Sequence, residues 1–306
     1  MKKRLLALFV ALLLVGCAAP TPSSDDAYVS FTDDSGQRVS LEEQPRRVAR
    51  LFSSFADLWQ LAGGEVAVTV GAAVERGIVP DGVLLVDAGA GKTVNTELLL
   101  AYQPDFVIGS ADIAAHVECA ALLRGAGTPV ALFRLECFDD YLRVLRVMTD
   151  VTGNTAAYEQ YGEAQKTNID ALLAASRGGE GKTVLFLRAG SSARSTKAKT
   201  SEQHFAAAML CELGARNLAD EAPVLVDGLA MEVIMAANPD LILITTMGDE
   251  DAARANMDAM LRKSTWQTLD AVQNGRVRYL DKELFQYKPN ARWYEAYSVL
   301  SELLDE

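Results

Sequence analysis

Four cationic side chains crowd one short stretch of an otherwise acidic sequence: Arg188, Arg194, Lys197 and Lys199. They follow an apolar run at residues 183–187 that has the composition of a buried strand. Guanidinium and ammonium groups bind the oxygens of anionic ligands, and parallel sheets bind ligands beyond the carboxyl ends of their strands. We therefore expect Arg188, Arg194 and Lys197 to contact a ligand, Arg188 foremost. A solvated charged loop is the alternative.

A second candidate lies near the C-terminus, where residues 285–294 mix aromatic and cationic side chains. Tyr287, Arg292 and Trp293 combine aromatic faces with a cation, which suits a large flat ligand. The alternative is that Trp293 and Tyr294 pack the last helix on the core.

The N-terminal half offers Ser53, Ser54 and Phe55, which follow a predicted strand at residues 48–52. Backbone N–H groups at the start of the helix predicted there suit an anionic or polar group of a ligand. A plain helix N-cap is the alternative.

Catalytic motifs are missing. Residues 89–93 and 181–183 look like parts of a phosphate-binding loop, but Val86 and Ser176 stand where the Walker pattern needs glycine. There is no GxSxG motif, and the two histidines, His116 and His204, fall in different halves. We predict a protein that is not an enzyme and holds no cofactor of its own.

Metal-ligating residues are equally sparse. A bare zinc or manganese ion would need several histidines or a dense set of histidines and carboxylates, so any iron is expected inside a chelate. Three cysteines follow Cys17, namely Cys119, Cys137 and Cys211. A Cys119–Cys137 disulfide and buried free thiols are both open.

The N-terminus has the pattern of a secretory signal. A basic start at residues 2–4 precedes an apolar run at 5–15, which is too short to span a bilayer. The run ends in Leu-Val-Gly-Cys17, which resembles the lipobox of bacterial lipoproteins. We expect a signal peptide at 1–16, and a lipidated Cys17 with a flexible tether at 17–27 that holds the protein on the outer side of the membrane.

Charge and size narrow the class of partner. The full chain carries a formal charge of −12 and becomes more negative once the basic start is removed, which argues against nucleic-acid binding. Half of the residues are apolar, enough for two cores in the mature chain.

Two segments repeat each other. Glu97 and Glu232 each precede Pro-Asp by seven residues, and an apolar run follows each Pro-Asp, at 106–108 and 241–244. Each segment predicts a short helix with glutamate in its first turn, ended by proline and followed by a buried parallel strand.

Alternating strands and helices predict an α/β fold with two Rossmann-like lobes and mainly parallel sheets. We place the lobes at 28–153 and 179–306, joined by one long helix at 154–178. That helix would be ~35 Å long, with Gly162 as its weakest point.

In order and spacing, the chain resembles the helical-backbone substrate-binding proteins of bacterial ABC importers for ferric siderophores, haem and cobalamin. The segments that carry the resemblance are residues 44–48, 53–64, 95–108, 125–130, 153–154, 232–244 and 266–277.

The resemblance implies a monomer that binds a metal chelate between its lobes with modest closure. A ferric siderophore is the first expectation because of the cationic stretch, and haem or cobalamin come next. Zinc or manganese binding and a structural lipoprotein without a ligand are further alternatives. The resemblance also implies that Glu97 and Glu232 dock onto a permease dimer, which works with a cytoplasmic ATPase. Stabilisation of the first helical turn is the plainer role for either glutamate.

Overall fold

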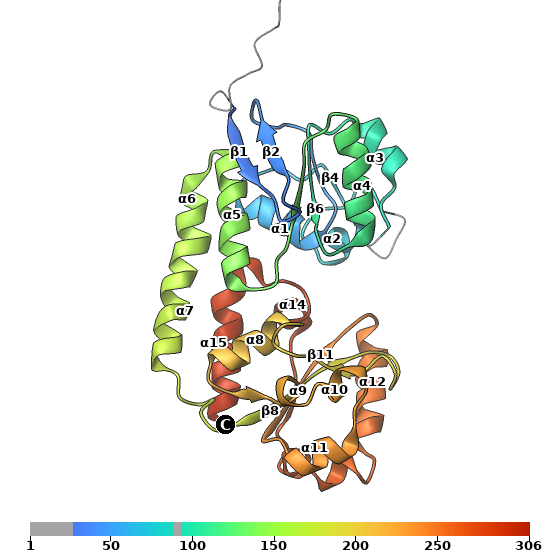
Figure 1. Ribbon diagram of the computed structural model, residues 1–306, viewed down its shortest axis with the longest axis vertical. Helices are drawn as coiled ribbons and strands as arrows, with labels where there is room; N and C mark the ends of the chain where they lie inside the picture. The colour runs from blue at the N-terminus through green and yellow to red at the C-terminus, as the bar shows by residue number, and fades with distance from the viewer. Residues whose placement is uncertain (1–26, 88–92) are drawn as a thin grey trace, which may run out of the picture.

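The computed structural model describes residues 27–87 and 93–306, which form two α/β lobes, one above the other in Figure 1. The expected signal peptide, Cys17 and most of the expected tether lie outside the described residues. Within the described part, no helix is long and apolar enough to cross a membrane.

The N-terminal lobe is built on a parallel five-stranded sheet of order β5-β4-β3-β6-β7. Its strands are β3 (Val48–Arg50), β4 (Val68–Thr69), β5 (Leu84–Leu85), β6 (Phe106–Ser110) and β7 (Val130–Phe133). An antiparallel hairpin of β1 (Val29–Thr32) and β2 (Arg38–Leu41) precedes them. The helices are α1 (Ser53–Leu61), α2 (Gly71–Glu75), α3 (Thr96–Tyr102), α4 (Ala114–Gly125) and α5 (Phe138–Thr152).

The C-terminal lobe has a four-stranded parallel sheet of order β10-β8-β11-β12, to which β9 adds an antiparallel pair with β8. The strands are β8 (Thr183–Ala189), β9 (Lys197–Ala198), β10 (Arg216–Asn217), β11 (Leu241–Thr246) and β12 (Val277–Tyr279). The helices are α8 (Phe205–Glu212), α9 (Leu218–Glu221), α10 (Val224–Asp227), α11 (Met231–Ala237), α12 (Glu250–Leu261), η2 (Trp266–Thr268), α13 (Asp270–Gln273), α14 (Lys282–Phe285), η3 (Asn290–Arg292) and α15 (Trp293–Asp305).

These sheets confirm the predicted α/β fold class with mainly parallel strands. Two local expectations need correction. Arg188 lies inside β8 rather than in a loop after it, and Lys197 forms β9. Two residues are too few to show a strand pattern in the sequence, so β9 could not be predicted.

The predicted linking helix is continuous but not uniformly α-helical. It consists of α6 (Thr155–Tyr158), a π-helical turn η1 (Glu159–Glu163) and α7 (Ala164–Ala175). The π turn contains Gly162, where a Cβ atom would lie 3.3 Å from Leu142 and 3.4 Å from Leu145 of α5. Gly162 therefore allows the linking helix to pack closely on α5, and the irregularity falls at this residue.

One apolar core extends through both lobes. It includes Phe138 and Tyr141 of α5, Phe205 of α8, and Trp293 and Tyr297 of α15. The last helix, α15 (red in Figure 1), contacts both α7 and α8. Separate apolar clusters cover the other face of each sheet. The lobes are thus joined by a packed helical layer.

The sequence repeat is a structural repeat. α3 and α11 each span seven residues and end at a left-handed residue, Gln103 (φ 53°) and Asn238 (φ 44°). The aspartate that follows each proline ties the next strand to its neighbour. Asp105 accepts a hydrogen bond from the Arg47 N–H at 2.8 Å, and Asp240 accepts one from the Thr183 N–H at 2.8 Å.

Candidate functional site

The two lobes approach each other along residues 283–293. Arg76, at the end of α2, pairs with Glu283 of α14 at 2.9 Å, and its guanidinium lies 4.3 Å from the ring centroid of Tyr287. Lys288 pairs with Glu136, which follows β7, at 3.0 Å. Glu136 follows the carboxyl end of β7, and open parallel sheets bind ligands beyond such ends, so the space between the lobes is the candidate ligand site.

On the C-terminal side, three cations share one face of the sheet. Arg188 lies directly opposite Lys197 in the β8–β9 pair, and Lys199 continues that strand beside Phe186. Residues opposite each other in antiparallel strands point to the same face. Lys197 donates to the Asp227 carbonyl at 2.7 Å.

Among the described residues, none of these three cations has a carboxylate counter-ion: no carboxylate oxygen lies within 4.0 Å of their charged groups. Burial lowers the pKa of Arg188. Burial, followed by repulsion from Arg188 and Lys197, lowers the pKa of Lys199. An anion bound here would relieve both effects.

His204 locates a further cation in this cluster. Its Nδ1 accepts a hydrogen bond from the Ala206 N–H at 3.2 Å and so caps α8. Burial, and then the charges of Lys288, Arg188 and Lys199, lower the pKa of His204 to about 3. Lys288 Nζ lies 4.9 Å from the ring centroid of Phe205, which stacks on His204 at 4.9 Å, so Lys288 joins the group. We call Arg188, Lys197, Lys199 and Lys288 the cationic cluster.

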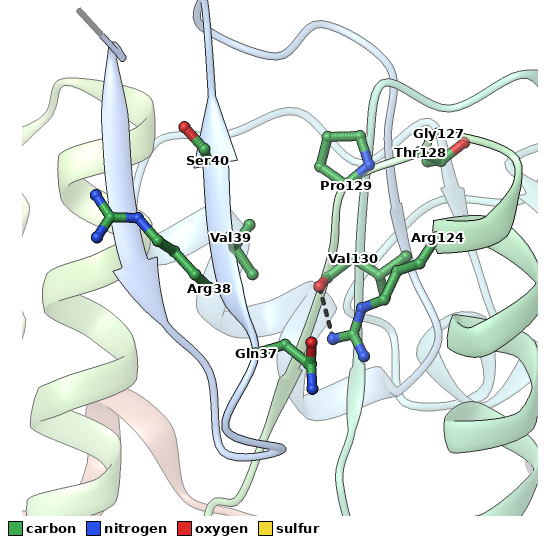
Figure 2. A pocket seen from close by; sticks show the side chains of 9 residues that line it. All are labelled: Gln37, Arg38, Val39, Ser40, Arg124, Gly127, Thr128, Pro129 and Val130. Atoms are coloured by element: carbon green, nitrogen blue, oxygen red, sulfur yellow. Dashed lines mark hydrogen bonds between the residues drawn. The ribbon is translucent and has the colours of Figure 1, made fainter. Parts of the chain in front are cut away.

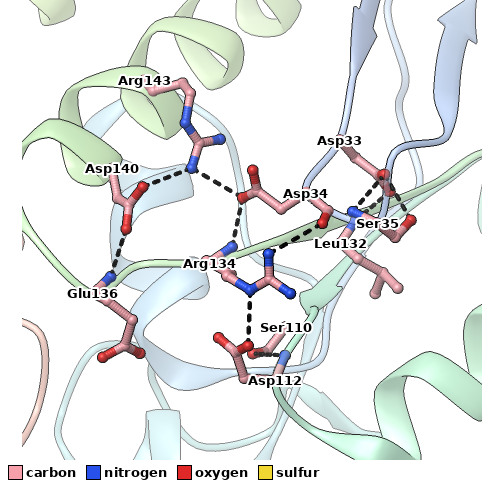
Figure 3. A network of polar contacts seen from close by, with 10 residues as sticks. All are labelled: Asp33, Asp34, Ser35, Ser110, Asp112, Leu132, Arg134, Glu136, Asp140 and Arg143. Atoms are coloured by element: carbon pink, nitrogen blue, oxygen red, sulfur yellow. Dashed lines mark hydrogen bonds and ion pairs between the residues drawn. The ribbon is translucent and has the colours of Figure 1, made fainter. Parts of the chain in front are cut away.

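The matching N-terminal surface has its charges paired internally. Arg134, after β7, forms an ion pair with Asp112, which follows β6 (Figure 3), and its Nε lies 3.0 Å from the carboxylate. Arg143 bridges Asp34 and Asp140, each at 2.9 Å. Arg134 and Arg143 are therefore neutralised by carboxylates, unlike Arg188 and Lys199 on the C-terminal side.

The other candidates from the C-terminal segment do not join this cluster. Arg292 forms a two-point ion pair with Glu295, with nitrogen–oxygen distances of 2.6 and 2.7 Å. Trp293 is fully buried, with its ring centroid 5.9 Å from that of Phe138 and 5.4 Å from that of Phe205. The expectation that Trp293 contacts a ligand is corrected, because it packs α15 on the shared core. Tyr287 remains near the space between the lobes, where its ring packs against the Arg76 guanidinium.

Arg194 also lies apart. It is exposed in the turn between β8 and β9, with no hydrogen bond or ion pair to the described residues. Arg194 therefore fits the alternative interpretation of this segment, a solvated charged loop.

The serine turn is covered. Ser53 and Ser54 are buried, and Phe55 packs against Phe133. Ser53 Oγ accepts a hydrogen bond from Arg76 at 3.2 Å, so Arg76 rather than the serine borders the space. The N-cap of α1 is Phe52, and it makes no side-chain cap, so the alternative N-cap role for the serines is also corrected.

Asn290 secures this junction and has no counterpart among the sequence candidates. It is fully buried with φ 47°, and its Nδ2 donates to the Ser54 carbonyl at 3.0 Å and to Asp57 at 2.7 Å. Burial raises the pKa of Asp57, which the hydrogen bond from Asn290 partly offsets.

Two cavities bordered by described residues lie elsewhere. One of about 310 Å³ is bordered by Gln37, Arg38 and Arg124, with Val130 at the start of β7 (Figure 2). It therefore lies at the amino end of that strand, away from the interlobe space. Another, of about 480 Å³, is lined partly by Asp220 and Asp227, which do not suit an anion.

Glu97 and Glu232 are exposed in the first turns of α3 and α11. Cys119, Cys137 and Cys211 are all free, so the alternative of a Cys119–Cys137 disulfide is wrong. The described residues contain no group of three or more His, Cys, Asp or Glu side chains that could hold a metal ion.

Comparisons with known proteins agree with this architecture. Residues 48–284 match the family described as periplasmic binding protein. A Bacillus subtilis (strain 168) protein, "Putative ABC transporter substrate-binding lipoprotein YhfQ", is 24% identical, and the match covers 100% of this chain and 98% of YhfQ.

Solved structures share the fold at low identity. The periplasmic heme-binding protein RhuT from Roseiflexus sp. RS-1 superimposes with a TM-score of 0.69 at 20% identity, over 85% of this chain and 98% of RhuT. Staphylococcus aureus SirA complexed with staphyloferrin B superimposes with a TM-score of 0.67 at 16% identity, over 90% of this chain and 97% of SirA.

The family description and the name of YhfQ denote binding proteins, and neither denotes an enzyme. Since the family match runs from β3 into α14, this chain belongs to the periplasmic binding protein family, as the order of its sequence segments predicts.

Proposed function

We propose that this chain is the extracytoplasmic substrate-binding lipoprotein of an ABC importer, and that it captures an anionic metal chelate, a ferric siderophore, between its lobes. The observation that carries the proposal is the cationic cluster, in which Arg188 and Lys199 have no carboxylate partner among the described residues. The name of YhfQ and the ligand of SirA support the class.

The charge of the cluster argues for a chelate over a bare ion. A divalent cation would be repelled by Arg188, Lys197 and Lys199, whereas carboxylate, catecholate or hydroxamate oxygens would be attracted. Charge-assisted hydrogen bonds from these groups would also fix the orientation of the chelate. Haem, through its propionates, is the second candidate, because RhuT binds heme and shares the fold.

The ligand class can be tested by thermal unfolding of the protein, purified after expression of the full chain. The panel holds ferric siderophores, haem, cobalamin and Zn(II). Ligand at ~100-fold above its Kd adds ~2.7 kcal/mol to the free energy of unfolding, which shifts the Tm by a few degrees. A shift with a ferric siderophore alone is the expected result. A shift confined to haem or Zn(II) would replace the proposed ligand, and no shift would contradict chelate binding.

Delivery is proposed to use Glu97 and Glu232 as docking carboxylates, one for each permease subunit. They occupy the same position in the two structural repeats, and neither is paired with a described cation. Uptake of the ligand found above should be abolished by the double substitution Glu97→Ala, Glu232→Ala, while ligand affinity stays unchanged. Normal uptake by this variant would rule out the docking role.

Anchoring is proposed to occur through acyl chains on Cys17. Mass spectrometry of the membrane fraction should find the mature chain beginning at an acylated Cys17, and Cys17→Ala should release the protein from the membrane. A membrane-bound Cys17→Ala variant would contradict the anchor.

A further inference from the structure

Beside each exposed glutamate stands an exposed apolar side chain. Leu100 lies one turn after Glu97 on α3 and is 42% exposed, and Met235 lies one turn after Glu232 on α11 and is 37% exposed. Side chains three residues apart on a helix lie on the same face. Each lobe therefore presents a carboxylate and a large apolar group together.

The two helices are set into their lobes in the same orientation. Leu99 and Ile234, which immediately precede the exposed apolar residues, are each 0% exposed in the outer apolar clusters of the two sheets. Ala101 and Ala236, which immediately follow them, are exposed in both. At matching positions, both helices thus bury one apolar side chain and expose the next.

This correspondence distinguishes the pair from ordinary surface exposure. Single exposed apolar residues are normal and need no explanation. Leu122 on α4 is 61% exposed and Val224 on α10 is 54% exposed, yet they belong to helices that are not equivalent in the repeat. Leu100 and Met235 recur together with the glutamates, so one chemical surface is displayed twice.

We infer that Leu100 and Met235 supply apolar contacts to a two-fold symmetric partner, next to the carboxylates of Glu97 and Glu232, at two equivalent surfaces. Each half of that partner presents a cationic group beside an apolar recess. The inference rests on the proposed function, in which the partner is the permease dimer, and adds that Leu100 and Met235 contribute apolar contacts to the binding. Two copies of one surface on the binding protein match two copies of one recess on the partner.

The two kinds of contact respond differently to salt. Carboxylate–cation contacts at a surface weaken as ionic strength rises, whereas burial of an apolar side chain is not screened. Removing the carboxylates should therefore flatten the salt dependence of affinity. Removing the apolar groups should lower affinity by a similar factor at every salt concentration.

The test measures the Kd between the protein, purified after expression of the full chain, and its permease–ATPase complex in nanodiscs, in 50 and 500 mM NaCl. Leu100→Gln with Met235→Gln is compared with Glu97→Gln with Glu232→Gln. Glutamine keeps high helix propensity, and unchanged Tm values would show intact folding. Leu122→Gln with Val224→Gln is the matched control for loss of exposed apolar surface.

We expect the Leu100/Met235 variant to bind at least about tenfold more weakly at both salt concentrations, because burial of one such side chain is worth about a factor of ten. The control should bind like wild type. If only the glutamate variant is weakened, docking by the glutamates stands and the apolar contribution is overturned. If the glutamate variant binds normally at both salt concentrations, the docking role itself fails. An equal loss in the Leu122/Val224 control would show a nonspecific effect and also overturn the inference.

Discussion

Arg188 combines partial burial, a lowered pKa and the absence of a carboxylate partner among the described residues. Its partly desolvated charge costs free energy in the unliganded protein, and a bound anion would offset that cost. This is the residue-level basis of the proposed ligand site.

Arg188→Gln should weaken binding of an anionic chelate about 10- to 100-fold, the range expected when a charge-assisted hydrogen bond is lost. The Tm of the unliganded variant should not fall, because the substitution removes no ion pair. Isothermal titration calorimetry checks the first expectation. Arg194→Gln, at an exposed residue of the same segment, is the matched control and should bind like wild type. Equal affinities for Arg188→Gln and wild type would remove Arg188 from the site.

His204 predicts a dependence of stability on pH. Burial lowers its pKa to about 3 in the folded protein, below the ordinary value of 6.5. The unfolded chain therefore takes up a proton first as the pH falls, so stability is lost below pH 6.5 at about 1.4 kcal/mol per pH unit.

His116, whose pKa burial lowers to about 4, adds a similar loss. His204→Asn should keep the helix cap and reduce the slope between pH 6.5 and 4.5 to about half. Urea unfolding across this range provides the measurement. An unchanged slope would mean that His204 is not held neutral.

Individual residues of the candidate site were predictable where charge made them conspicuous. The cluster around Arg188 could be found because cations crowd one stretch of an acidic chain. Arg76 could not, because its partner Glu283 lies in the other lobe, far away in sequence. Trp293 was misassigned because aromatic and cationic residues look alike in a ligand site and at a core helix. The correct signal was the helical spacing of buried side chains that begins there, at Trp293, Ala296, Tyr297, Leu300 and Leu304.

At the scale of elements, the linking helix shows which features a sequence pattern can predict and which it cannot. Its position and the weakness at Gly162 were both visible in the sequence. The π turn was not, because it depends on how closely α5 packs against that residue.

Gly162→Ala should lower the free energy of unfolding by about 1 kcal/mol. Alanine gains about 1 kcal/mol in helix propensity, but forcing a Cβ against Leu142 and Leu145 costs about 1–3 kcal/mol. Chemical denaturation gives the difference. Gly125→Ala, at the end of α4 with open space around it, is the control and should be neutral or stabilising. A stabilised Gly162→Ala variant would show that packing at the π turn is loose.

At the scale of the whole molecule, parallel sheets and paired lobes followed from the alternation of strands and helices. The core shared by both lobes could not be predicted in this way. It is assembled from α5, α8 and α15, whose apolar faces in the sequence do not reveal which partner they meet.

That shared core predicts one cooperative unfolding transition for both lobes. Trp59 reports on the N-terminal lobe and Trp266 on the C-terminal lobe. Fluorescence of the variants Trp59→Phe and Trp266→Phe should give denaturation midpoints that coincide with those from far-UV circular dichroism, after allowing for each variant's stability. Two separated transitions in one variant would contradict a common folding unit.

The cationic cluster sits in a chain of net charge −12, and this contrast sets the kinetics of capture. At 10 mM salt the Debye length is ~30 Å, so an anionic chelate approaching by diffusion first meets the repulsion of the whole molecule. At 150 mM the length shortens to ~8 Å, and the nearby cations dominate. If the chain captures an anionic chelate as proposed, the association rate constant should therefore rise with moderate salt, the reverse of ordinary electrostatic steering.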